Sequence, residues 1–188
     1  MENNKKPEKS RQKTPKKITP TYLENAGLYY LERYASSAEN FRKIMMRKIK
    51  NSCKFHNTEV GEFVPMLDKL IERYKSVGLL NDEVFARSKV ASLRRKGMGR
   101  QGIVAKLQAK GLSQEQIKSA LKEIDEDKED AELEAAREYV RRKKLGMHRT
   151  KTPDDLKKHT QKELASLARA GFSYEVARKA LEFDEEDL

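Results

Sequence analysis

The sequence predicts an all-α protein, built as an elongated tandem array of three three-helix repeats. The main observation is a near-repetition at a constant offset of 60 residues, in which the run from Gly111 to Leu121 matches the run from Gly171 to Leu181. Apolar residues recur at helical spacing elsewhere, and no alternating apolar run bounded by turn signals indicates a strand. With 38% charged residues, 37% hydrophobic residues and no Trp, thin cores of two or three helices suit the composition better than one thick core.

The positive charge of the chain is unevenly distributed. The formal net charge is +11, with a net +10 in residues 22–122 and a net −7 in the short segment 123–134. The long surfaces of tandem helical repeats favour a binding protein over an enzyme. A basic body interrupted by an acidic segment therefore indicates a polyanionic partner, or a partner already coated with a polyanion. Solubility is the alternative explanation, because net charge governs association and not fold.

The two ends of the chain are expected to lie outside the folded repeats. Residues 1–20 are rich in Lys and almost free of apolar residues, so we expect a disordered basic tail, and residues 184–188 form an acidic tail. The single cysteine, Cys53, excludes an internal disulfide and a multi-cysteine zinc cage. No apolar run approaches the ~20 residues of a membrane span, and none follows the N-terminal charges as in a secretory signal. These features predict a cytoplasmic protein.

The first repeat is expected over residues 21–78. Its apolar residues form stripes at helical spacing in three successive segments. These segments are a helix over about 22–34, a second helix ending near Lys50, a loop over 51–58, and a third helix over about 60–77.

Local signals set the ends of these helices. Ser36 and Glu39 have the spacing of a capping box, in which a hydroxyl and a carboxylate satisfy free backbone amides at the start of the second helix. Pro65 is compatible with the third helix only near its first turn. Gly78 is expected to end that helix, because glycine adopts the left-handed conformation of a C-terminal cap without penalty.

The second repeat is expected over residues 79–125. Asn81 or Asp82 caps its first helix, which ends in a basic run at 94–96, and a short helix over about 100–110 follows. Ser113 and Gln116 form a capping box for the third helix. Four side chains are predicted to lie in the core, namely Leu80, Phe85, Val90 and Leu107.

The third repeat is expected over residues 126–183. Its acidic beginning suits a first helical turn, where the helix dipole favours carboxylates. This first helix ends in a basic run at 141–144. Thr152 and Pro153 predict the start of the second helix, Gly171 predicts its end, and Ser173 caps the last helix.

One segment resembles the signature of a known family. The run Gly-Leu-Leu-Asn-Asp-Glu-Val-Phe-Ala at 78–86 is similar to a motif of the RecX family, and the Arg-Arg-Lys-Gly-x-Gly run at 94–99 continues it in order. The residues that match the motif are Gly78, Leu80, Asn81, Asp82, Phe85 and Ala86. The resemblance extends over about 22–183 and is strongest over 78–124, although the first repeat lacks the usual Lys-Gly end of its second helix and the third has extra residues near 150–160.

The resemblance implies a fold and a role. RecX proteins consist of three tandem three-helix units, bind the filament of the RecA recombinase, and mainly inhibit its ATPase activity, filament extension and strand exchange. A role in homologous recombination, DNA repair and the SOS response would follow, with no cofactor, no enzymatic activity and a monomeric state. The alternative function is that of a helical DNA-binding module, which acts directly on single-stranded or double-stranded DNA.

Two basic clusters are the candidate contacts to the recombinase or to DNA. They lie at corresponding ends of the first helices of the second and third repeats, so stacking of the repeats in register would place them along one edge. Such an edge suits a groove lined by acids or by phosphates. The alternative is a solvated helix end, where the dipole favours cations. The clusters comprise Arg94, Arg95, Lys96 and Arg100, and Arg141, Arg142, Lys143, Lys144 and Arg149.

The run from Gly97 to Gly102 is formally a G-x-G-x-x-G sequence. A dinucleotide site needs a preceding strand, and here a basic helix precedes the run. A flexible turn between helices is one interpretation. Another is that the glycines allow backbone amides to approach a phosphate beside the neighbouring basic residues.

The remaining polar and aromatic residues do not indicate catalysis. His56, His148 and His159 lack metal-ligand spacing, so no metal site is expected, and no Ser/His/Asp or Cys/His arrangement is evident. Four aromatic residues at helical spacing are assigned to core packing, namely Tyr34, Phe63, Tyr74 and Phe85. Base stacking would require exposed aromatic residues interleaved with basic ones, so direct sequence-specific reading of nucleic acid is not expected.

Overall fold

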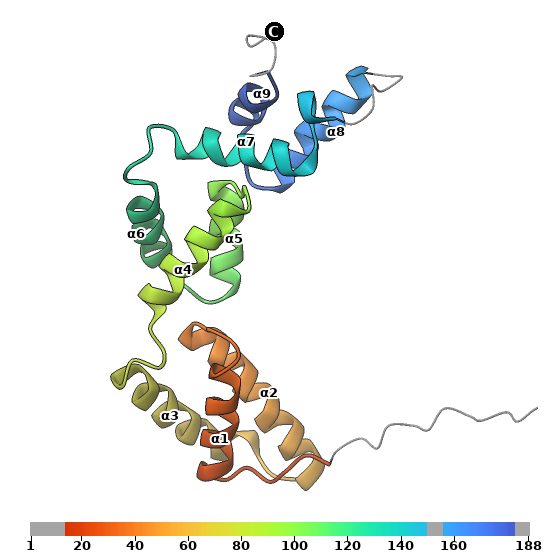
Figure 1. Ribbon diagram of the computed structural model, residues 1–188. Coiled ribbons are helices and arrows are strands. Elements are labelled where there is room, and N and C mark those ends of the chain that lie inside the picture. The colour runs from red at the N-terminus through yellow and green to blue at the C-terminus, as the bar shows by residue number, and fades with distance from the viewer. Residues whose placement is uncertain (1–13, 150–155, 183–188) are drawn as a thin grey trace, which may run out of the picture.

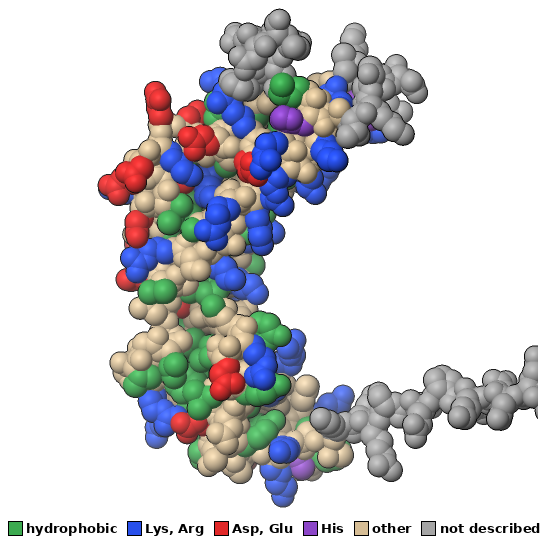
Figure 2. Space-filling model, viewed as in Figure 1, with side chains coloured by type: hydrophobic (Ala, Val, Ile, Leu, Met, Phe, Trp, Pro, Cys, Tyr) green, Lys and Arg blue, Asp and Glu red, His purple; other side chains and the backbone are tan. Residues whose placement is uncertain are grey.

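The protein is a curved stack of helices. The computed structural model describes residues 14–149 and 156–182, and within these residues there are nine α-helices, two short 3-10 helices and no strand. The helices follow one another in three groups of three, which together form a C-shaped molecule with a hollow on one side (Figures 1 and 2). The predicted all-α, elongated tandem fold is confirmed. Among the described helices, none has the length and apolarity needed to cross a membrane.

The first group contains α1 (Pro20–Leu31), α2 (Ala38–His56) and α3 (Val64–Ser76), the last preceded by a 3-10 turn at Val60–Phe63. Pro65 lies in the first turn of α3, as expected. The predicted loop over 51–58 is wrong for residues 51–56, because α2 continues for six residues beyond Lys50. Burial of Ser52 and Cys53 against the repeat stabilises this extra length.

The start of α2 differs by one residue from the predicted cap. Ser37, not Ser36, is the N-cap, and its hydroxyl accepts a hydrogen bond from the Asn40 amide (3.2 Å). Ser36 instead donates to the Ser37 carbonyl oxygen. Either of the two adjacent serine hydroxyls could cap the helix. The contact of Ser37 with the distant Lys110 carbonyl oxygen selects Ser37 as the cap.

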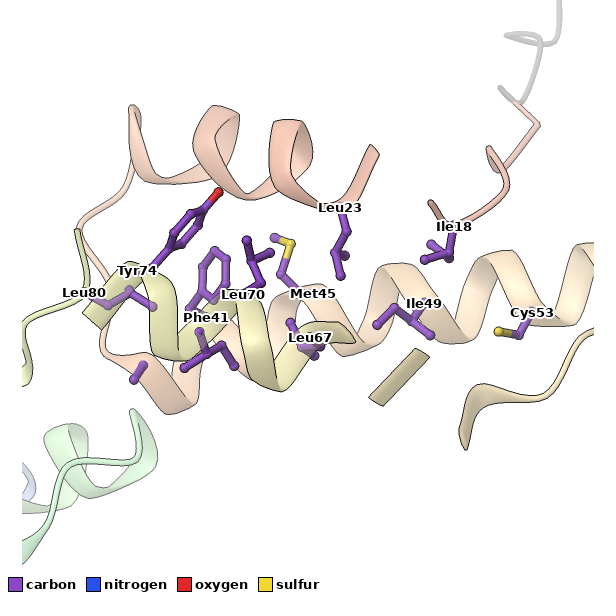
Figure 3. Packing of buried hydrophobic residues seen from close by; sticks show 12 residues of the cluster. Ile18, Leu23, Phe41, Met45, Ile49, Cys53, Leu67, Leu70, Tyr74 and Leu80 are labelled. Carbon is purple, nitrogen blue, oxygen red and sulfur yellow. The ribbon is translucent and has the colours of Figure 1, made fainter. Parts of the chain in front are cut away.

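Part of the predicted N-terminal tail is folded onto α2. Ile18 lies in the first core, Ser52 donates to the Lys16 carbonyl oxygen (2.7 Å), and a His56 ring nitrogen lies 2.9 Å from the Pro15 carbonyl oxygen (Figure 3). The prediction of disorder over 1–20 is therefore wrong for the segment from residue 14 onward. The rest of that tail and the acidic tail at 184–188 lie outside the described residues.

The second group contains α4 (Asp82–Arg95), α5 (Arg100–Ala109) and α6 (Gln114–Asp125). Asn81 caps α4 by accepting hydrogen bonds from the Glu83 and Val84 amides. The predicted capping box of α6 is present in full, with the Ser113 hydroxyl and the Gln116 side chain each accepting from the backbone amide of the other residue.

The third group contains α7 (Ala131–Lys143), α8 (Leu156–Arg169) and α9 (Tyr174–Glu182), with a 3-10 turn at Gly146–His148. Acidic residues occupy the first turn of α7, as the dipole argument predicts. The helix start predicted at Thr152 and Pro153 falls outside the described residues.

Each group has its own apolar core, and the three cores are separate. Phe85, Val90 and Leu107 are buried in the second core as predicted, whereas Leu80 is buried in the first core, where its amide donates to the Tyr74 carbonyl oxygen (3.0 Å). Among the aromatic residues assigned to the core, the prediction is wrong for Tyr34, which is 59% exposed because α1 ends three residues earlier. Three thin cores leave much of the stability of the molecule to the contacts between groups.

Candidate partner-binding surface

The positive charge belongs mainly to the second helix of each group. Lys and Arg outnumber Asp and Glu by six to one in α2, by two to none in α5 and by four to one in α8. The first helices together carry eight basic residues and six acids. The third helices carry seven of each. The excess of charge is thus a property of one helix position in the repeat.

These second helices lie on the concave side of the molecule. In Figure 1, α2, α5 and α8 lie towards the hollow, while α3 and α6 lie on the outer side. Figure 2 shows Lys and Arg gathered along the inner side and acids concentrated on the outer side around the α6–α7 connection. We call the exposed basic residues of the second helices the basic line. It comprises Lys43, Arg47, Lys48, Lys50, Lys54, Arg100, Lys106, Lys162 and Arg169.

The end of α5 meets the beginning of α2. The Ser37 hydroxyl donates a hydrogen bond to the Lys110 carbonyl oxygen, and the Ala38 amide donates to the Asp82 carboxylate (2.8 Å). Gly111 (φ +81°) lies against the Glu39 side chain, so closely that a Cβ atom there would be 2.4 Å from the Cβ of Glu39. We call this contact the first joint.

The end of α8 meets the beginning of α5 in the same way, and we call this contact the second joint. The Gly99 amide donates to the Ala170 carbonyl oxygen (3.0 Å), and the Arg100 amide donates to the Glu132 carboxylate (2.8 Å). In both joints, the positive N-terminal end of one helix dipole faces the negative C-terminal end of the next. In both, an acid at the start of the next group's first helix satisfies a free amide. The three second helices therefore lie end to end.

The glycines of the G-x-G-x-x-G run allow the second joint to close. A Cβ atom on Gly99 would be 2.4 Å from the Gly171 carbonyl oxygen, and one on Gly102 would be 2.5 Å from the Ala170 oxygen. Gly97 (φ +63°) lies as tightly against the backbone of Tyr139. The amides of Gly99 and Arg100, at the start of α5, already donate to protein acceptors. The interpretation of this run as a phosphate-binding loop is therefore wrong.

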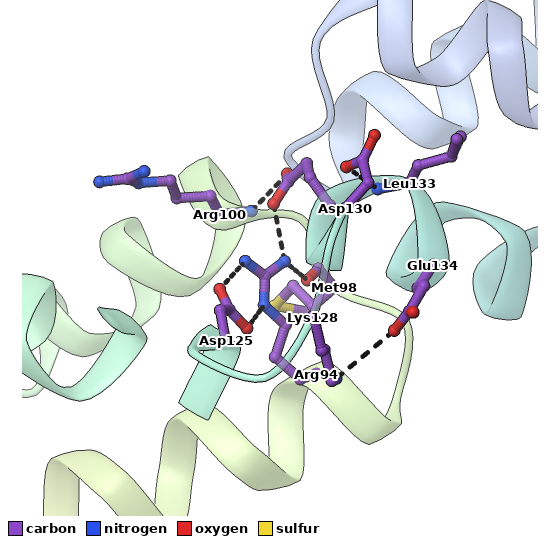
Figure 4. A network of polar contacts seen from close by, with 9 residues as sticks. Arg94, Met98, Arg100, Asp125, Lys128, Asp130, Leu133 and Glu134 are labelled. Carbon is purple, nitrogen blue, oxygen red and sulfur yellow. Dashed lines mark hydrogen bonds and ion pairs between the residues drawn. The ribbon is translucent and has the colours of Figure 1, made fainter. Parts of the chain in front are cut away.

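Arg94 lies inside the second joint and is only 6% exposed. Its guanidinium pairs with Asp125 (Nη2 to Oδ2, 2.6 Å) and with Glu132 (Nη1 to Oε2, 2.7 Å), and donates to the Met98 carbonyl oxygen (3.2 Å) (Figure 4). The prediction that Arg94 contacts a partner is wrong, because its hydrogen-bonding groups are directed within the chain. The residue ties the second group to the third.

Glu132 links the ion pair of Arg94 to the start of α5 within the second joint. One carboxylate oxygen pairs with Arg94 and the other accepts from the Arg100 amide. Burial alone would lower the pKa of Arg94, but the hydrogen bonds of Asp125 and Glu132 outweigh burial and raise that pKa above its ordinary value. The guanidinium therefore stays charged, as a buried ion must be paired to be tolerated.

The two predicted basic clusters do meet across the second joint. Arg142 donates to the Lys96 carbonyl oxygen (2.5 Å). Arg141 is exposed and forms a two-bond pair with Glu138 (2.9 Å each), and this hydrogen bonding lowers the pKa of the Glu138 carboxyl. The guanidinium of Arg149 pairs with the buried carboxylate of Glu163.

These contacts divide the predicted contact residues. Arg149 holds the third group together through Glu163 and is not among the proposed partner contacts. The guanidinium of Arg100 points away from the ion pairs of the second joint, although its amide is part of that joint (Figure 4). The residues that stay exposed and available as candidates are Arg95, Lys96, Arg100, Arg141, Arg142, Lys143 and Lys144.

The basic residues of α2 and α8 were missed by the reasoning from sequence. The predicted clusters consist of adjacent basic residues, whereas the basic residues of α2 are spread from Arg42 to Lys54, over roughly three and a half turns. The signal was present as the ratio of basic to acidic residues in one helix position of each repeat. Recognising it requires knowing that these helices share one side of the molecule.

Comparison with known proteins finds a family profile and two relatives that carry the same family name. A family profile described as RecX, second three-helix domain, matches residues 81–121. A relative named Regulatory protein RecX from Myxococcus xanthus is 40% identical over 170 residues, which cover 90% of this chain and 89% of the relative. A protein of the same name from Agrobacterium fabrum is 28% identical over 167 residues, which cover 89% and 85%.

A solved structure shares the fold. The protein described as "Crystal structure of regulatory protein RecX" superposes with a TM-score of 0.58, covering 90% of this chain and 72% of that chain. The two sequences are 18% identical. At that level the likeness concerns the fold alone.

The close approach at Gly99 gives a first test of the joint. We expect Gly99→Ala to lower the free energy of unfolding by about 1–3 kcal/mol, because the added methyl group meets backbone that cannot move aside easily. Gly61→Ala is the matched control, since nothing lies within 4 Å of its Cβ position. Urea unfolding followed by circular dichroism measures both, and equal stabilities of the two variants would contradict the tight joint.

The Arg94 ion pairs give a second test. Arg94→Met leaves two carboxylates without their partner, and we expect a loss of about 3 kcal/mol in the free energy of unfolding. This is the low end for a buried pair, because Asp125 and Glu132 keep 20% and 25% of their side-chain surface exposed. Arg95→Met, at the exposed neighbouring residue, should change stability by less than about 0.5 kcal/mol. If the two variants unfold alike, Arg94 does not tie the groups together.

Proposed function

This chain belongs to the RecX family of regulatory proteins, and we propose that it binds the filament that the RecA recombinase forms on single-stranded DNA. Bound there, it restrains ATP turnover, filament extension and strand exchange. The observation that supports this proposal most directly is the excess of basic residues on the second helices, which the two joints hold on the concave side of a curved stack.

The shape and the charge fit a helical polyanionic filament. The second helices contain 19, 10 and 14 residues, which at 1.5 Å per residue correspond to a summed length of roughly 65 Å. A concave surface of that length spans several neighbouring subunits or nucleotides. Positive potential spread along it attracts acids and phosphates and orients the approach of the protein.

Inhibition by such a protein requires no reactive group. A ligand shifts an equilibrium between two filament states by the difference in its affinity for them. A long rigid surface matches one helical pitch better than another, so binding favours one filament state and opposes the changes that accompany ATP turnover. We therefore propose that the chain acts by binding alone.

A DNA-binding module that acts without the recombinase is the second candidate. The basic line favours it as well, because Lys and Arg neutralise phosphates irrespective of what else is bound to the DNA. The two candidates differ in the partner that gives the tightest binding.

Charge reversal on two faces tests the role of the basic line. We expect Lys50→Glu with Lys106→Glu to weaken retention on preformed filaments by about tenfold or more, because these exposed side chains lie on second helices. Lys69→Glu with Lys118→Glu is the matched control, with the same change of net charge on third helices of the same two groups. Co-sedimentation measures retention, and an equal loss in both variants would show that net charge alone matters.

A comparison of substrates separates the two candidate functions. Retention on recombinase filaments should exceed retention on bare single-stranded DNA at both low and raised salt, because only the filament offers protein surface in addition to phosphates. Co-sedimentation at two salt concentrations, with each substrate, measures this. Equal retention on both substrates at both concentrations would remove the proposal and favour the DNA-binding module.

A further inference from the structure

Two pairs of side chains lie at and just beyond the end of α1, Tyr29 with Arg33 and Tyr30 with Tyr34, and we call the exposed residues Tyr29, Arg33 and Tyr34 the aromatic cluster. Tyr29 is 62% exposed and Tyr34 is 59% exposed. Large exposed aromatic side chains in a cluster often mark binding surfaces. Nothing in the three apolar cores requires these two rings, since Tyr30 and Tyr74 supply the aromatic contacts to Phe41.

The cluster contains a stacked arginine. The Arg33 guanidinium lies 3.6 Å from the centre of the Tyr29 ring, and its Nη1 donates to the Tyr29 carbonyl oxygen (3.0 Å). The ring and the carbonyl group therefore hold the planar guanidinium in place before any ligand arrives. Glu32 lies 3.5 Å from the same guanidinium and offsets its charge, so the cluster presents flat surfaces more than it presents net charge.

The Tyr34 ring packs at a tilted angle against Tyr30, and this pair connects the cluster to the first joint. The ring centres of Tyr30 and Tyr34 are 5.3 Å apart. The Tyr30 hydroxyl accepts a hydrogen bond from the Asn40 side-chain amide (3.2 Å), and the Asn40 oxygen accepts one from Lys110 Nζ (3.3 Å). A continuous chain of contacts thus leads from an exposed aromatic ring to the junction between α2 and α5, along which the basic line runs.

Flat rings beside a line of cations are the arrangement that binds single-stranded nucleic acid. Bases stack on aromatic rings and on guanidinium planes, while the backbone follows the cations, and this binding does not depend on the base sequence. A paired duplex hides the faces of its bases, so it cannot use the rings in this way. The sequence pattern did not reveal the cluster, because the helical spacing of Tyr34 predicts a core position.

We infer that the aromatic cluster of Tyr29, Arg33 and Tyr34 binds an unstacked base of single-stranded DNA whose phosphates lie along the basic line. The inference rests on the proposed function in one respect, because it takes nucleic acid to be a component of the bound filament. It assigns the bases to the tyrosines and the phosphates to the lysines and arginines. A protein partner at the same cluster is the competing occupant, since Tyr and Arg are also common at the centres of protein interfaces.

The absence of Trp from the sequence allows a direct optical test. Tyr34→Trp places a single tryptophan in the cluster, and Tyr174→Trp places one at an exposed tyrosine of the third group as the matched control. The ligands are an oligothymidylate and an abasic oligonucleotide of equal length, which carry the same phosphates. We expect quenching of the Tyr34→Trp emission by the oligothymidylate alone, and no quenching of the control by either ligand.

Affinities supply the second measurement. Tyr34→Leu should bind the oligothymidylate about tenfold more weakly than the unsubstituted protein, with unchanged affinity for the abasic oligonucleotide, and Tyr174→Leu should change neither. Circular dichroism checks that both variants are folded. Three results would overturn the inference. The first two are equal quenching by both oligonucleotides and no binding of the oligothymidylate. The third is a Tyr34→Leu defect seen only with recombinase present, which would favour a protein contact. Retention on filaments is measured separately, so this inference and the proposed function fail independently.

Discussion

The end-to-end stacking of α2, α5 and α8 is the constraint on which the rest of the structure depends. Three thin cores could each form with any relative orientation of the groups, and the joints select one orientation. They do so with the same local chemistry twice: a helix start against a helix end, and an acid on a free amide. The curvature of the molecule and the position of the basic line both follow from this repeated contact.

The two joints use different side chains for the same geometry. The second joint combines glycines, which permit backbone to touch backbone, with a buried ion-pair network around Arg94. The first relies on Ser37, Asp82 and the contact of Gly111 with Glu39. Because desolvation of a buried ion offsets much of its attraction, the network around Arg94 specifies an orientation more than it adds stability. The proposed preference for one filament state needs that specificity.

Local chemistry made much of the fold predictable from sequence. Gly78, Gly111 and Gly171 marked the ends of three helices because each adopts positive φ, and apolar periodicity identified the number of helices. Predictions failed where distant residues decide. The partners of Arg94 lie 31 and 38 residues away along the chain, and no local pattern distinguishes it from the exposed Arg95. The spacing of Tyr34 continues the apolar stripe of α1 in the sequence, but the helix ends at Leu31, so Tyr34 is not carried into the core.

The central claim is that the joints hold the second helices in one fixed line in the free protein. The most direct measurement is the distance distribution between spin labels at Lys48→Cys in α2 and Lys162→Cys in α8, in a Cys53→Ala background, by pulsed electron paramagnetic resonance. Rigid joints predict one narrow distribution without any partner present. A broad or multiple distribution would show that the groups reorient freely, and it would contradict the account of a preformed concave binding surface.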